Sequence, residues 1–272
     1  MAMSAIPPGV TSIVSALASG TPAHFLFLFD FDGTLVEFAP TPAVASFPDG
    51  RRDALARLAS RPEATVGVVS GRRLSDVRAK VGLSTPLYFA GLHGMEIEGG
   101  GASFLHDGVR RSRLVISESR TLAQRALLGL AGVVVEDKDY SFVLHTRLAA
   151  PSVKATAMQA LHAVLAPFEQ RGEVRLQLGH GMAEVLPNVR WNKGDAVRWI
   201  QQRVSEHARS VPRTMYVGDD ITDEDAFRAL GPEGVTVVVG SRPSAARFRL
   251  ADPGAVDALV RMLAAMPART RI

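Results

Sequence analysis

The sequence of 272 residues contains no cysteine. A disulfide framework, a thiolate nucleophile and a cysteine-ligated zinc are therefore excluded, and any bound metal must be held by oxygen or imidazole ligands. Apolar runs long enough to cross a bilayer are also missing, and residues 1–23 lack the basic start and apolar core of a signal peptide. We expect a cytoplasmic protein with no membrane partner, in which residues 1–23 form a loose leader.

Lysine is scarce as well, and aromatic residues make up only 6% of the chain. The net charge of +4 rests on arginines that are spread along the sequence without forming a basic stripe between aromatic residues. Nucleic acid is therefore not an expected partner. With 47% hydrophobic and 21% charged residues, the chain has the composition of an ordinary globular protein. The few lysines are Lys80, Lys138, Lys154 and Lys193.

Short runs of β-branched and aromatic residues alternate with longer segments rich in Ala, Leu and Arg that have helical periodicity. This alternation is typical of an α/β domain in which helices connect the strands of a parallel sheet. The predicted strands span residues 25–31, 65–70, 87–91, 214–218 and 235–240. The predicted helices span residues 51–60, 73–81, 194–208, 224–230 and 255–266.

The middle of the chain breaks this alternation. Its pattern predicts a helix at 114–130, strands at 133–136 and 141–146, a second helix at 152–170, and strands at 174–178 and 182–186. Closely spaced strand pairs favour an antiparallel sheet with helices on one face. We therefore predict an α+β domain at residues 106–187, inserted into a Rossmann-like parallel-sheet core formed by residues 1–105 and 188–272.

Two carboxylates end the first predicted strand, which runs into Asp30, Asp32 and Gly33. Because side chains alternate along a strand, Asp30 and Asp32 leave it on the same side, and Gly33 allows a sharp turn. Two carboxylates in one place either raise a pKa or recruit a cation, and oxygen ligands without sulfur favour Mg²⁺. The alternative is an ordinary turn in which these residues have no chemical role.

Two further segments carry residues suited to binding phosphate. Ser70 follows a buried strand, where a hydroxyl and backbone N–H groups can cradle phosphoryl oxygens. Lys193 lies at the start of a predicted helix and offers a compact positive charge. Taken alone, Ser70 is better explained as a helix N-cap, and Lys193 fits a solvated helix start equally well.

An acidic segment at residues 219–225 follows the predicted strand 214–218. It is not an EF-hand loop, because Glu224 stands where that loop needs glycine and because the flanking segments are a strand and a helix. Glu224 and Asp225 fit the first turn of a helix, where acidic residues stabilise the helix dipole. Asp219 and Asp223, nearer the strand end, are better suited to bind a metal.

These segments gather at the carboxyl ends of the predicted parallel strands, where open α/β sheets bind their ligands. The set resembles the haloacid dehalogenase superfamily, in which a DxDGT loop, a Ser or Thr, a Lys and an acidic loop surround Mg²⁺ and a phosphoryl group. The resemblance implies that Asp30 is the nucleophile and a metal ligand, and that Asp32 is the general acid/base and offers its backbone carbonyl to the metal. The inserted domain matches the larger cap type of that superfamily. The remaining implied residues are Ser70 and Lys193 for phosphate, and Asp219 and Asp223 for the metal.

Within the superfamily, the chain more closely resembles the trehalose-6-phosphate phosphatases. The matching segments are FDFDGTL at 29–35, GLHGME at 91–96, EDK at 136–138, HTR at 145–147, EVLP at 184–187, WNKG at 191–194 and GDDITDEDAF at 218–227. This resemblance implies a Mg²⁺-dependent hydrolysis of trehalose 6-phosphate to trehalose and phosphate through an aspartyl-phosphate. Cap residues at the positions of Glu136, Lys138 and Glu184 contact the sugar in that family, although solvated charges on strands would look the same by residue type. The implied substrate-binding residues are Gly71, Arg72, His93, Glu136, Lys138, Arg147, His180 and Glu184.

Two positions depart from the family pattern. His180 stands where relatives usually carry lysine, and Leu186 stands where they usually carry arginine, so fixed positive charge is lost near the expected sugar site. Related cap-bearing phosphatases that act on sucrose phosphate or on mannosyl- or glucosyl-phosphoglycerate therefore stay open as alternatives. A phosphosugar-binding regulator without catalysis is a further alternative, which the intact set of aspartates disfavours. The expected partner is a small sugar phosphate, and a monomer is favoured.

Overall fold

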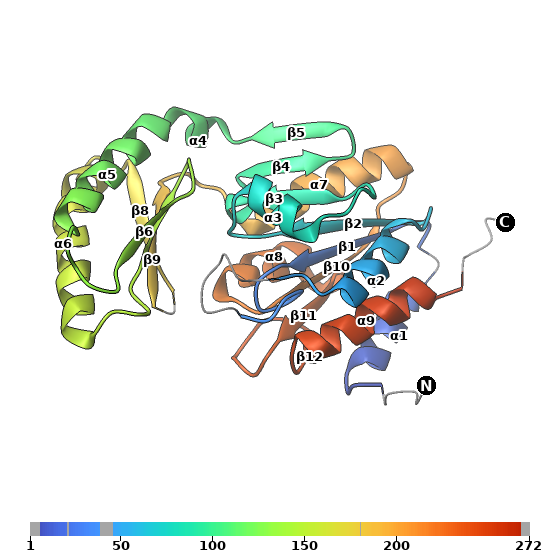
Figure 1. Ribbon diagram of the computed structural model, residues 1–272. Coiled ribbons are helices and arrows are strands. Elements are labelled where there is room, and N and C mark those ends of the chain that lie inside the picture. The colour runs from blue at the N-terminus through green and yellow to red at the C-terminus, as the bar shows by residue number, and fades with distance from the viewer. Residues whose placement is uncertain (1–5, 21, 39–45, 180, 268–272) are drawn as a thin grey trace. The chain divides into compact units, whose positions relative to one another are not determined.

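The computed structural model of the chain describes residues 6–20, 22–38, 46–179 and 181–267, which fall into two compact units (Figure 1). The larger unit comprises Met1–Phe104 and Trp191–Ile272, and the smaller unit is the continuous segment Leu105–Arg190. The chain thus leaves the larger unit once and returns to it once. At this junction, within the larger unit, the ring of Phe104 stacks on that of Trp191 with 4.8 Å between centroids.

A sheet runs through the larger unit, and its described strands follow the order β12-β11-β10-β1-β2-β3-β4-β5. Neighbouring strands from β12 to β3 are parallel, and β4 is antiparallel to β3. The α/β core with a mainly parallel sheet, predicted from the sequence, is confirmed. The strands are β1 (Phe25–Asp30), β2 (Ala64–Val69), β3 (Tyr88–Gly91), β4 (Glu96–Gly99), β5 (Ala102–Leu105), β10 (Arg213–Gly218), β11 (Val235–Val239) and β12 (Phe248–Leu250).

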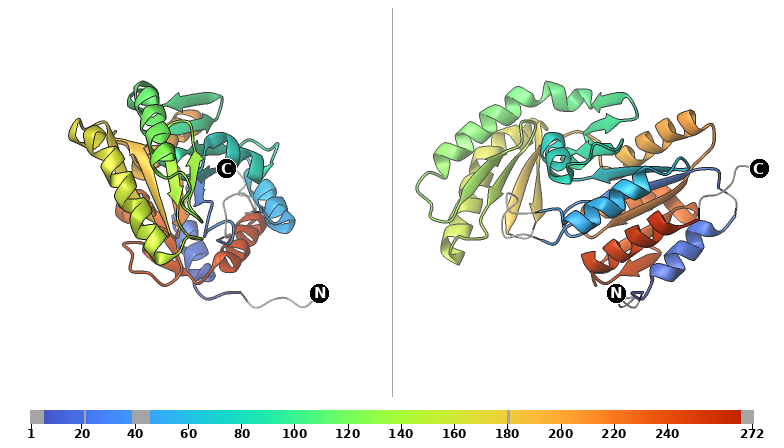
Figure 2. Two further views of the ribbon diagram at one scale, coloured as in Figure 1. Left: turned by 60° about the vertical axis from the view of Figure 1, so that its left-hand side comes forward. Right: turned by 45° about the vertical axis from the view of Figure 1, so that its right-hand side comes forward.

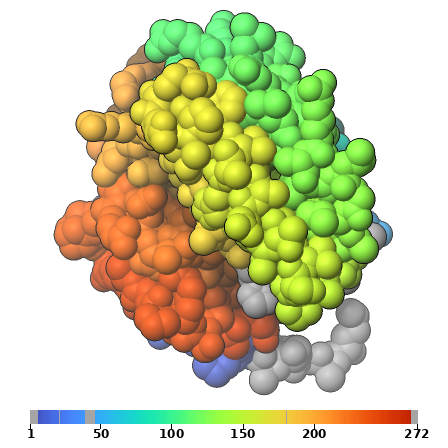
Figure 3. Space-filling model, turned by 90° about the vertical axis from the view of Figure 1, so that its left-hand side faces the viewer, coloured from blue at the N-terminus to red at the C-terminus, as the bar shows by residue number. Residues whose placement is uncertain are grey.

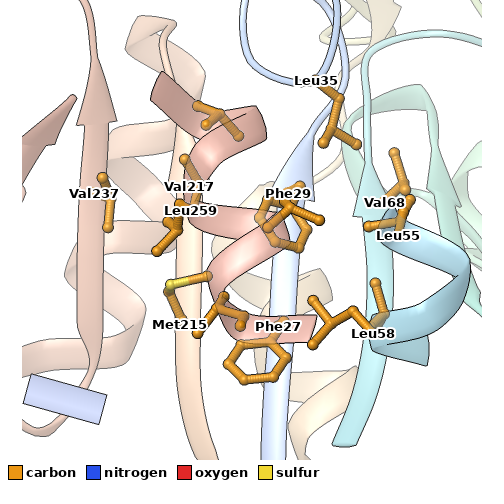
Figure 4. Close-up of a cluster of buried hydrophobic side chains, with 14 of the residues drawn as sticks. Phe27, Phe29, Leu35, Leu55, Leu58, Val68, Met215, Val217, Val237 and Leu259 are labelled. Carbon is orange, nitrogen blue, oxygen red and sulfur yellow. The ribbon is translucent and has the colours of Figure 1, made fainter. Parts of the chain in front are cut away.

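Helices cover both faces of this sheet (Figures 1 and 2). Along β1 the side chains alternate: Phe27 and Phe29 belong to the core cluster with α1, α2 and α9, whereas Leu26 and Leu28 belong to the cluster with α7 and α8. Figure 4 shows Phe27 and Phe29 packed among side chains of neighbouring strands and of α2 and α9. Burial on both faces explains why this strand reads as a continuous apolar run. The helices are α1 (Val10–Ala18), α2 (Asp49–Ala59), α3 (Leu74–Val81), α7 (Lys193–Ala208), α8 (Glu224–Leu230) and α9 (Pro253–Ala265).

The N-terminal segment corrects the expectation of a loose leader over residues 1–23. Residues Val10–Ala18 form α1, and Val10, Ile13 and Leu17 are fully buried in the core next to α9. Their spacing of three and four residues places them on one face of the helix. The neighbouring prolines at 7, 8 and 22 flank this helix and do not interrupt it, so they are not a sign of an unstructured segment.

The sequence analysis does not predict the hairpin of β4 and β5. Each strand has only four residues; Gly99 ends β4, Gly100 and Gly101 form the turn, and all three glycines are at positive φ. Glycine adopts this conformation without steric cost, which permits the turn. The three-residue strand β12 is likewise too short to stand out in the sequence. Most predicted elements end within one or two residues of the observed ones; β1, for example, ends at Asp30 instead of residue 31.

The smaller unit contains an antiparallel sheet in the order β6-β7-β9-β8. Ile116 of α5 and Leu161 of α6 belong to one buried cluster with Phe142 and Val185 of the sheet, so both helices cover the same face. They form the surface of this unit that faces the viewer in Figure 3, coloured green to yellow. This is the α+β architecture predicted for the insert. Its elements are α4 (Asp107–Arg111), α5 (Arg113–Ala126), β6 (Val134–Asp137), β7 (Phe142–His145), α6 (Pro151–Gln170), β8 (Val174–Gly179) and β9 (Met182–Pro187).

Candidate active site

Acidic side chains meet at the carboxyl end of the parallel sheet. Asp30 is the last residue of β1, and Asp219 directly follows β10, the parallel neighbour of β1. Asp223 ends the short 3₁₀ turn Ile221–Asp223 that follows. One oxygen from each of these three carboxylates lies within 4.8 Å of one oxygen from each of the others. Strand pairing therefore gathers the acidic residues that the sequence singles out for metal binding.

Lys193 binds two of these carboxylates. Its Nζ lies 2.7 Å from Oδ1 of Asp30 and 2.6 Å from Oδ1 of Asp223, and all three side chains are at least nine-tenths buried. The helix start is fixed by a capping box, in which the Asn192 side chain accepts from backbone N–H groups of the first turn and Asp195 returns the contact. The solvated helix start considered from the sequence is wrong, because Lys193 is buried and paired.

The loop after β1 allows Asp219 to approach. Gly33 has φ of +77°, and a Cβ added there would lie 2.4 Å from Oδ2 of Asp219, so only glycine fits this position. The hydroxyl of Thr34 donates to Oδ1 of Asp219 at 3.1 Å. The hydroxyl of Tyr216, buried in β10, donates to Oδ1 of Asp223 at 2.7 Å. Hydrogen bonds from the loop after β1 and from β10 therefore orient two carboxylates of the group.

Burial dominates the electrostatics of this group. It raises the pKa of Asp30 well above its ordinary value; the Asp223 and Asp219 carboxylates raise it further, while Lys193 opposes the shift. Burial and the charge of Asp223 raise the pKa of Asp219 to about 7. Burial alone would lower the pKa of Lys193, but Asp223 and Asp30 outweigh it and raise that pKa. The positive charge of Lys193 therefore does not offset the burial of Asp30 and Asp219.

This group fits Mg²⁺. Three carboxylates and one ammonium carry a formal net charge of −3 + 1 = −2 when all are ionised, which one divalent cation neutralises. The donors are all oxygens, as hard cations require, and they converge from two chain segments, the end of β1 and the segment after β10. The side chain of Asp32 is not a member of the group, which leaves its backbone carbonyl as the donor suggested by the superfamily resemblance.

Asp32 is held by Arg72. The Arg72 guanidinium donates to both carboxylate oxygens of Asp32, at 2.6 and 2.7 Å, and its remaining nitrogen donates to Asp76 at 2.8 Å. It also lies over the ring of Phe31, 5.4 Å from the ring centroid. A two-pronged contact of this kind fixes the orientation of a carboxylate. The Asp32 side chain keeps 31% of its surface exposed, so a ligand can reach it.

Ser70 and its neighbours form a tightly packed loop. The Ser70 hydroxyl accepts from the backbone N–H of Arg72 at 3.1 Å, and the Ser70 carbonyl accepts from the N–H of His93 at 2.9 Å. A Cβ at Gly71 would lie 2.7 Å from Cε1 of the His93 ring. Leu92 and His93 both have positive φ, at 51° and 57°, an uncommon conformation that marks a constrained segment. Ser70 does not act as a side-chain cap for α3, whose N-cap residue is Arg73.

The smaller unit holds the residues predicted to bind the sugar. Oε1 of Glu184, on β9, accepts from Nζ of Lys138 at 3.2 Å and from the hydroxyl of Ser141 at 2.9 Å. Glu184 is 1% and Lys138 8% exposed, so the interpretation of both as solvated strand charges is wrong. Arg147 is exposed, Leu186 is buried, and His180 lies outside the described residues.

Glu136 makes a separate contact in the same sheet. Its Oε2 lies 2.7 Å from Nε2 of His145 on the neighbouring strand β7. This hydrogen bond is the largest cause of a lowered pKa at Glu136; burial opposes the shift and the charge of Lys138 adds to it. Glu136 is therefore held in its ionised form, as an acceptor.

Sequence reasoning missed Thr34, Tyr216, Ser141 and Arg242, which all contact predicted site residues. Thr34 is part of the DxDGT motif and could have been included on that ground. Tyr216 is a polar residue within an apolar strand that leads into the acidic segment, which is a weaker signal. Nothing in the sequence marks Ser141 or Arg242, because their contacts depend on the folded arrangement of the backbone.

A mainly parallel α/β core thus carries an inserted α+β domain, and a buried group of carboxylates and a lysine lies at the carboxyl end of the core sheet. The chain belongs to the trehalose-phosphatase family, whose model matches residues 28–254. The family resemblance seen in the sequence is thereby confirmed.

Individual relatives agree with this assignment. The chain is 35% identical to the trehalose-phosphate phosphatase of Mycobacterium bovis over 280 residues, which cover 98% of this chain and 69% of the relative. It is 33% identical to the enzyme of the same name from Mycobacterium ulcerans over 268 residues, with 96% of this chain and 67% of the relative covered. The fold matches the C-terminal domain of the Candida albicans trehalose-6-phosphate phosphatase, with a TM-score of 0.80, 23% identity, and coverage of 97% and 99% of the two chains. Within the described part of the chain, no helix has the length and apolar character needed to span a membrane.

Proposed function

We propose that this protein is a Mg²⁺-dependent phosphatase that hydrolyses trehalose 6-phosphate to trehalose and phosphate through a phosphorylated Asp30. The observation that carries this proposal is the buried group in which Lys193 bridges Asp30 and Asp223 beside Asp219. A nucleophilic carboxylate needs a fixed position and neighbouring positive charge to approach an anionic phosphoryl group. Lys193 supplies part of that positive charge.

In the first step a carboxylate oxygen of Asp30 forms a bond to phosphorus, and the bond from phosphorus to the sugar oxygen breaks. Asp32 donates a proton to the departing sugar oxygen, and Arg72 orients the carboxyl for this transfer. The Ser70 hydroxyl accepts from the N–H of Arg72, which leaves its proton to donate to a phosphoryl oxygen. A bound Mg²⁺ would neutralise the phosphoryl oxygens and align them for the attack.

In the second step water attacks the phosphorus of the aspartyl-phosphate and releases inorganic phosphate. Asp32, now a carboxylate, takes the proton of the attacking water, so the same residue serves as acid and then as base. Asp30 returns as a free carboxylate. Its contact with Lys193 stabilises the negative charge that reappears. The protein thus regains its starting protonation state after each turnover.

Recognition of the sugar is assigned to Glu136, Lys138 and Glu184 of the smaller unit. Neighbours hold each carboxylate in place, His145 at Glu136 and Ser141 with Lys138 at Glu184. Carboxylates fixed in this way can also accept hydrogen bonds from sugar hydroxyls, and a ligand that lacks the matching hydroxyl does not gain those bonds. This chemistry supports selection for a polyhydroxylated leaving group.

The proposal is tested by measuring phosphate release from trehalose 6-phosphate, sucrose 6-phosphate, mannosyl- and glucosyl-phosphoglycerate and p-nitrophenyl phosphate, with Mg²⁺ and with excess EDTA. We expect the highest kcat/KM with trehalose 6-phosphate, and activity only with the metal. Asp30→Asn keeps the shape but removes the nucleophilic charge, so its turnover should fall by several orders of magnitude. Asp225→Asn, a matched change on the surface of α8, should leave turnover unchanged. Full activity in EDTA, or an active Asp30→Asn protein, contradicts the mechanism, and a preference for another glycoside contradicts the substrate.

A further inference from the structure

One arginine far along the sequence contacts the backbone of the acidic loop. Arg242 lies after β11, and its Nε and Nη2 donate to the carbonyl oxygens of Asp219 and Asp220 at 2.5 and 2.6 Å. Its Nη1 donates to a carboxylate oxygen of Glu224, the first residue of α8, and to the carbonyl of Pro243. All three nitrogens of the guanidinium are therefore engaged; two of these four contacts are with the loop between β10 and α8, and a third is with the first residue of α8.

The contacted peptide groups adjoin the metal-binding group. Asp219 contributes one of the three carboxylates, and the backbone N–H of Asp220 donates to Oδ2 of Asp223, which contributes another. Thr34, in the loop after β1, and Tyr216, in β10, hold the two carboxylates. These bonds orient side chains, whereas Arg242 is bound to the main chain that carries them. The geometry of the loop thus depends on a planar guanidinium that bridges two consecutive carbonyl groups.

The segment that carries Arg242 is itself anchored. The second oxygen of Glu224 accepts from the backbone N–H of Ala245 at 2.9 Å, and Arg249 donates to the carbonyl of Arg242 at 2.9 Å. The Glu224 side chain is 8% exposed and that of Arg242 is 25% exposed, so water competes little for the contact at Glu224. The loops after β10 and β11 are therefore tied together by hydrogen bonds on both sides of the guanidinium.

We propose that Arg242 is a positioning residue for the Mg²⁺ site, which fixes the main chain at Asp219 and Asp220 so that the carboxylates stay grouped for the ion. The inference rests on the metal dependence in the proposed function. Residues that hold metal ligands in place typically contribute about 10- to 100-fold to metal affinity. Arg242 contacts the main chain of Asp219 and Asp220 and not the grouped carboxylates or the reacting atoms, so it acts through the loop.

Charge alone would have the opposite effect. A guanidinium beside a cation site repels the cation, so removing Arg242 would tighten Mg²⁺ binding if electrostatics were its main influence. Loss of loop geometry would weaken it. The two explanations therefore differ in sign, and a single binding measurement separates them. Arg242→Lys retains the charge but cannot bridge two carbonyl groups with a planar fork. This variant therefore shows how much of the change in Mg²⁺ affinity comes from the loop geometry.

The experiment measures the dissociation constant of Mg²⁺ by isothermal titration calorimetry for the 272-residue chain at one pH and ionic strength. Arg247→Ala is the matched control, because Arg247 donates to the carbonyls of Pro232 and Gly234, outside the acidic loop. We expect about 10- to 100-fold weaker binding for Arg242→Ala, a smaller loss for Arg242→Lys, and wild-type affinity for Arg247→Ala. The half-saturating Mg²⁺ concentration in the phosphatase assay should rise in parallel, while kcat at saturating Mg²⁺ recovers.

Unchanged or tighter binding in Arg242→Ala overturns the inference. If that variant does not fold, as judged by circular dichroism, Arg242→Lys decides by the same criterion. Equal weakening in Arg247→Ala also overturns it, because the effect would then be a general response to losing an arginine from this surface. A wild-type protein that does not bind Mg²⁺ refutes the metal requirement of the proposed function and, with it, the assignment of Arg242. If the wild type binds Mg²⁺ and the Arg242→Ala protein binds it with the same affinity, only the assignment of Arg242 is refuted.

Discussion

Replacing Asp219 by asparagine should stabilise the metal-free protein at alkaline pH. The pKa of Asp219 is raised from 3.8 to about 7 by burial and by the charge of Asp223. A group with a raised pKa in the folded state contributes stability that is complete below its unfolded pKa and is lost as pH rises through its folded pKa. Metal-free wild-type protein should therefore lose stability between about pH 4 and pH 7 through this residue.

The magnitude follows from the size of the shift. Three pKa units at about 1.4 kcal/mol each give up to about 4 kcal/mol of lost unfolding free energy above pH 7. Asparagine carries no charge and can still accept the hydrogen bond from Thr34, so Asp219→Asn should recover most of this loss. Near pH 4 the folded carboxyl is protonated and that of the unfolded chain is only about half ionised, so most of the loss has not yet developed and the two proteins should be close in stability.

Urea denaturation in EDTA, followed by circular dichroism at several pH values between 4 and 8.5, measures this difference. Asp225→Asn is the control, because its side chain is 41% exposed and lies outside the metal group. Adding Mg²⁺ should stabilise the wild type and leave Asp219→Asn nearly unchanged, since a ligand stabilises only the form that binds it. An Asp219→Asn protein that is less stable than wild type at pH 8 in EDTA would falsify the electrostatic reasoning.

Two further predictions concern the smaller unit and the N-terminal helix. Glu136→Ala and Glu184→Ala should lower kcat/KM for trehalose 6-phosphate far more than for p-nitrophenyl phosphate, because in the proposed function these carboxylates bind hydroxyls of the sugar, which the second substrate lacks; equal losses on both substrates would instead assign these residues to folding. Leu17→Ala should cost about 2–5 kcal/mol of unfolding free energy, since its side chain is fully buried against the core. The exposed Ser12→Ala in the same helix should cost little, and a similarly small loss for Leu17→Ala would show that α1 does not stabilise the fold.

Proximity of Asp30, Asp219 and Asp223 could be predicted from the sequence because three general rules act together. Apolar runs mark the buried strands, short motifs mark where each strand ends, and parallel strands bring these ends to one edge of the sheet. The position of Lys193 follows less directly, since a lysine at a helix start is usually solvated. Its burial is decided by where α7 packs, which depends on contacts across the whole core.

Other parts of the site lie beyond sequence reasoning for physical reasons. The bond from Tyr216 to Asp223 links residues seven positions apart, but only the turn geometry between them brings the two groups together. Arg242 binds main-chain carbonyls, and carbonyl groups are present at every residue, so no residue type in the acidic loop signals the contact. The helix α1 was misread because its stripe of three buried residues is short, and tertiary packing against α9 supplies the stability that its local sequence lacks.

The stacking of Phe104 on Trp191 has a consequence for how the inserted segment of such a protein can change during evolution. These rings belong to the larger unit and flank the points where the chain leaves it and returns, and Trp191 also donates to the carbonyl of Gly94 at 2.7 Å. The two ends of the insertion are therefore joined by contacts that the inserted segment does not provide. An insert of different length or sequence can be accommodated at this junction without rebuilding the sheet. If the proposed function holds, recognition of the leaving group and cleavage of the phosphate ester belong to separate modules, and one can be exchanged while the other is kept.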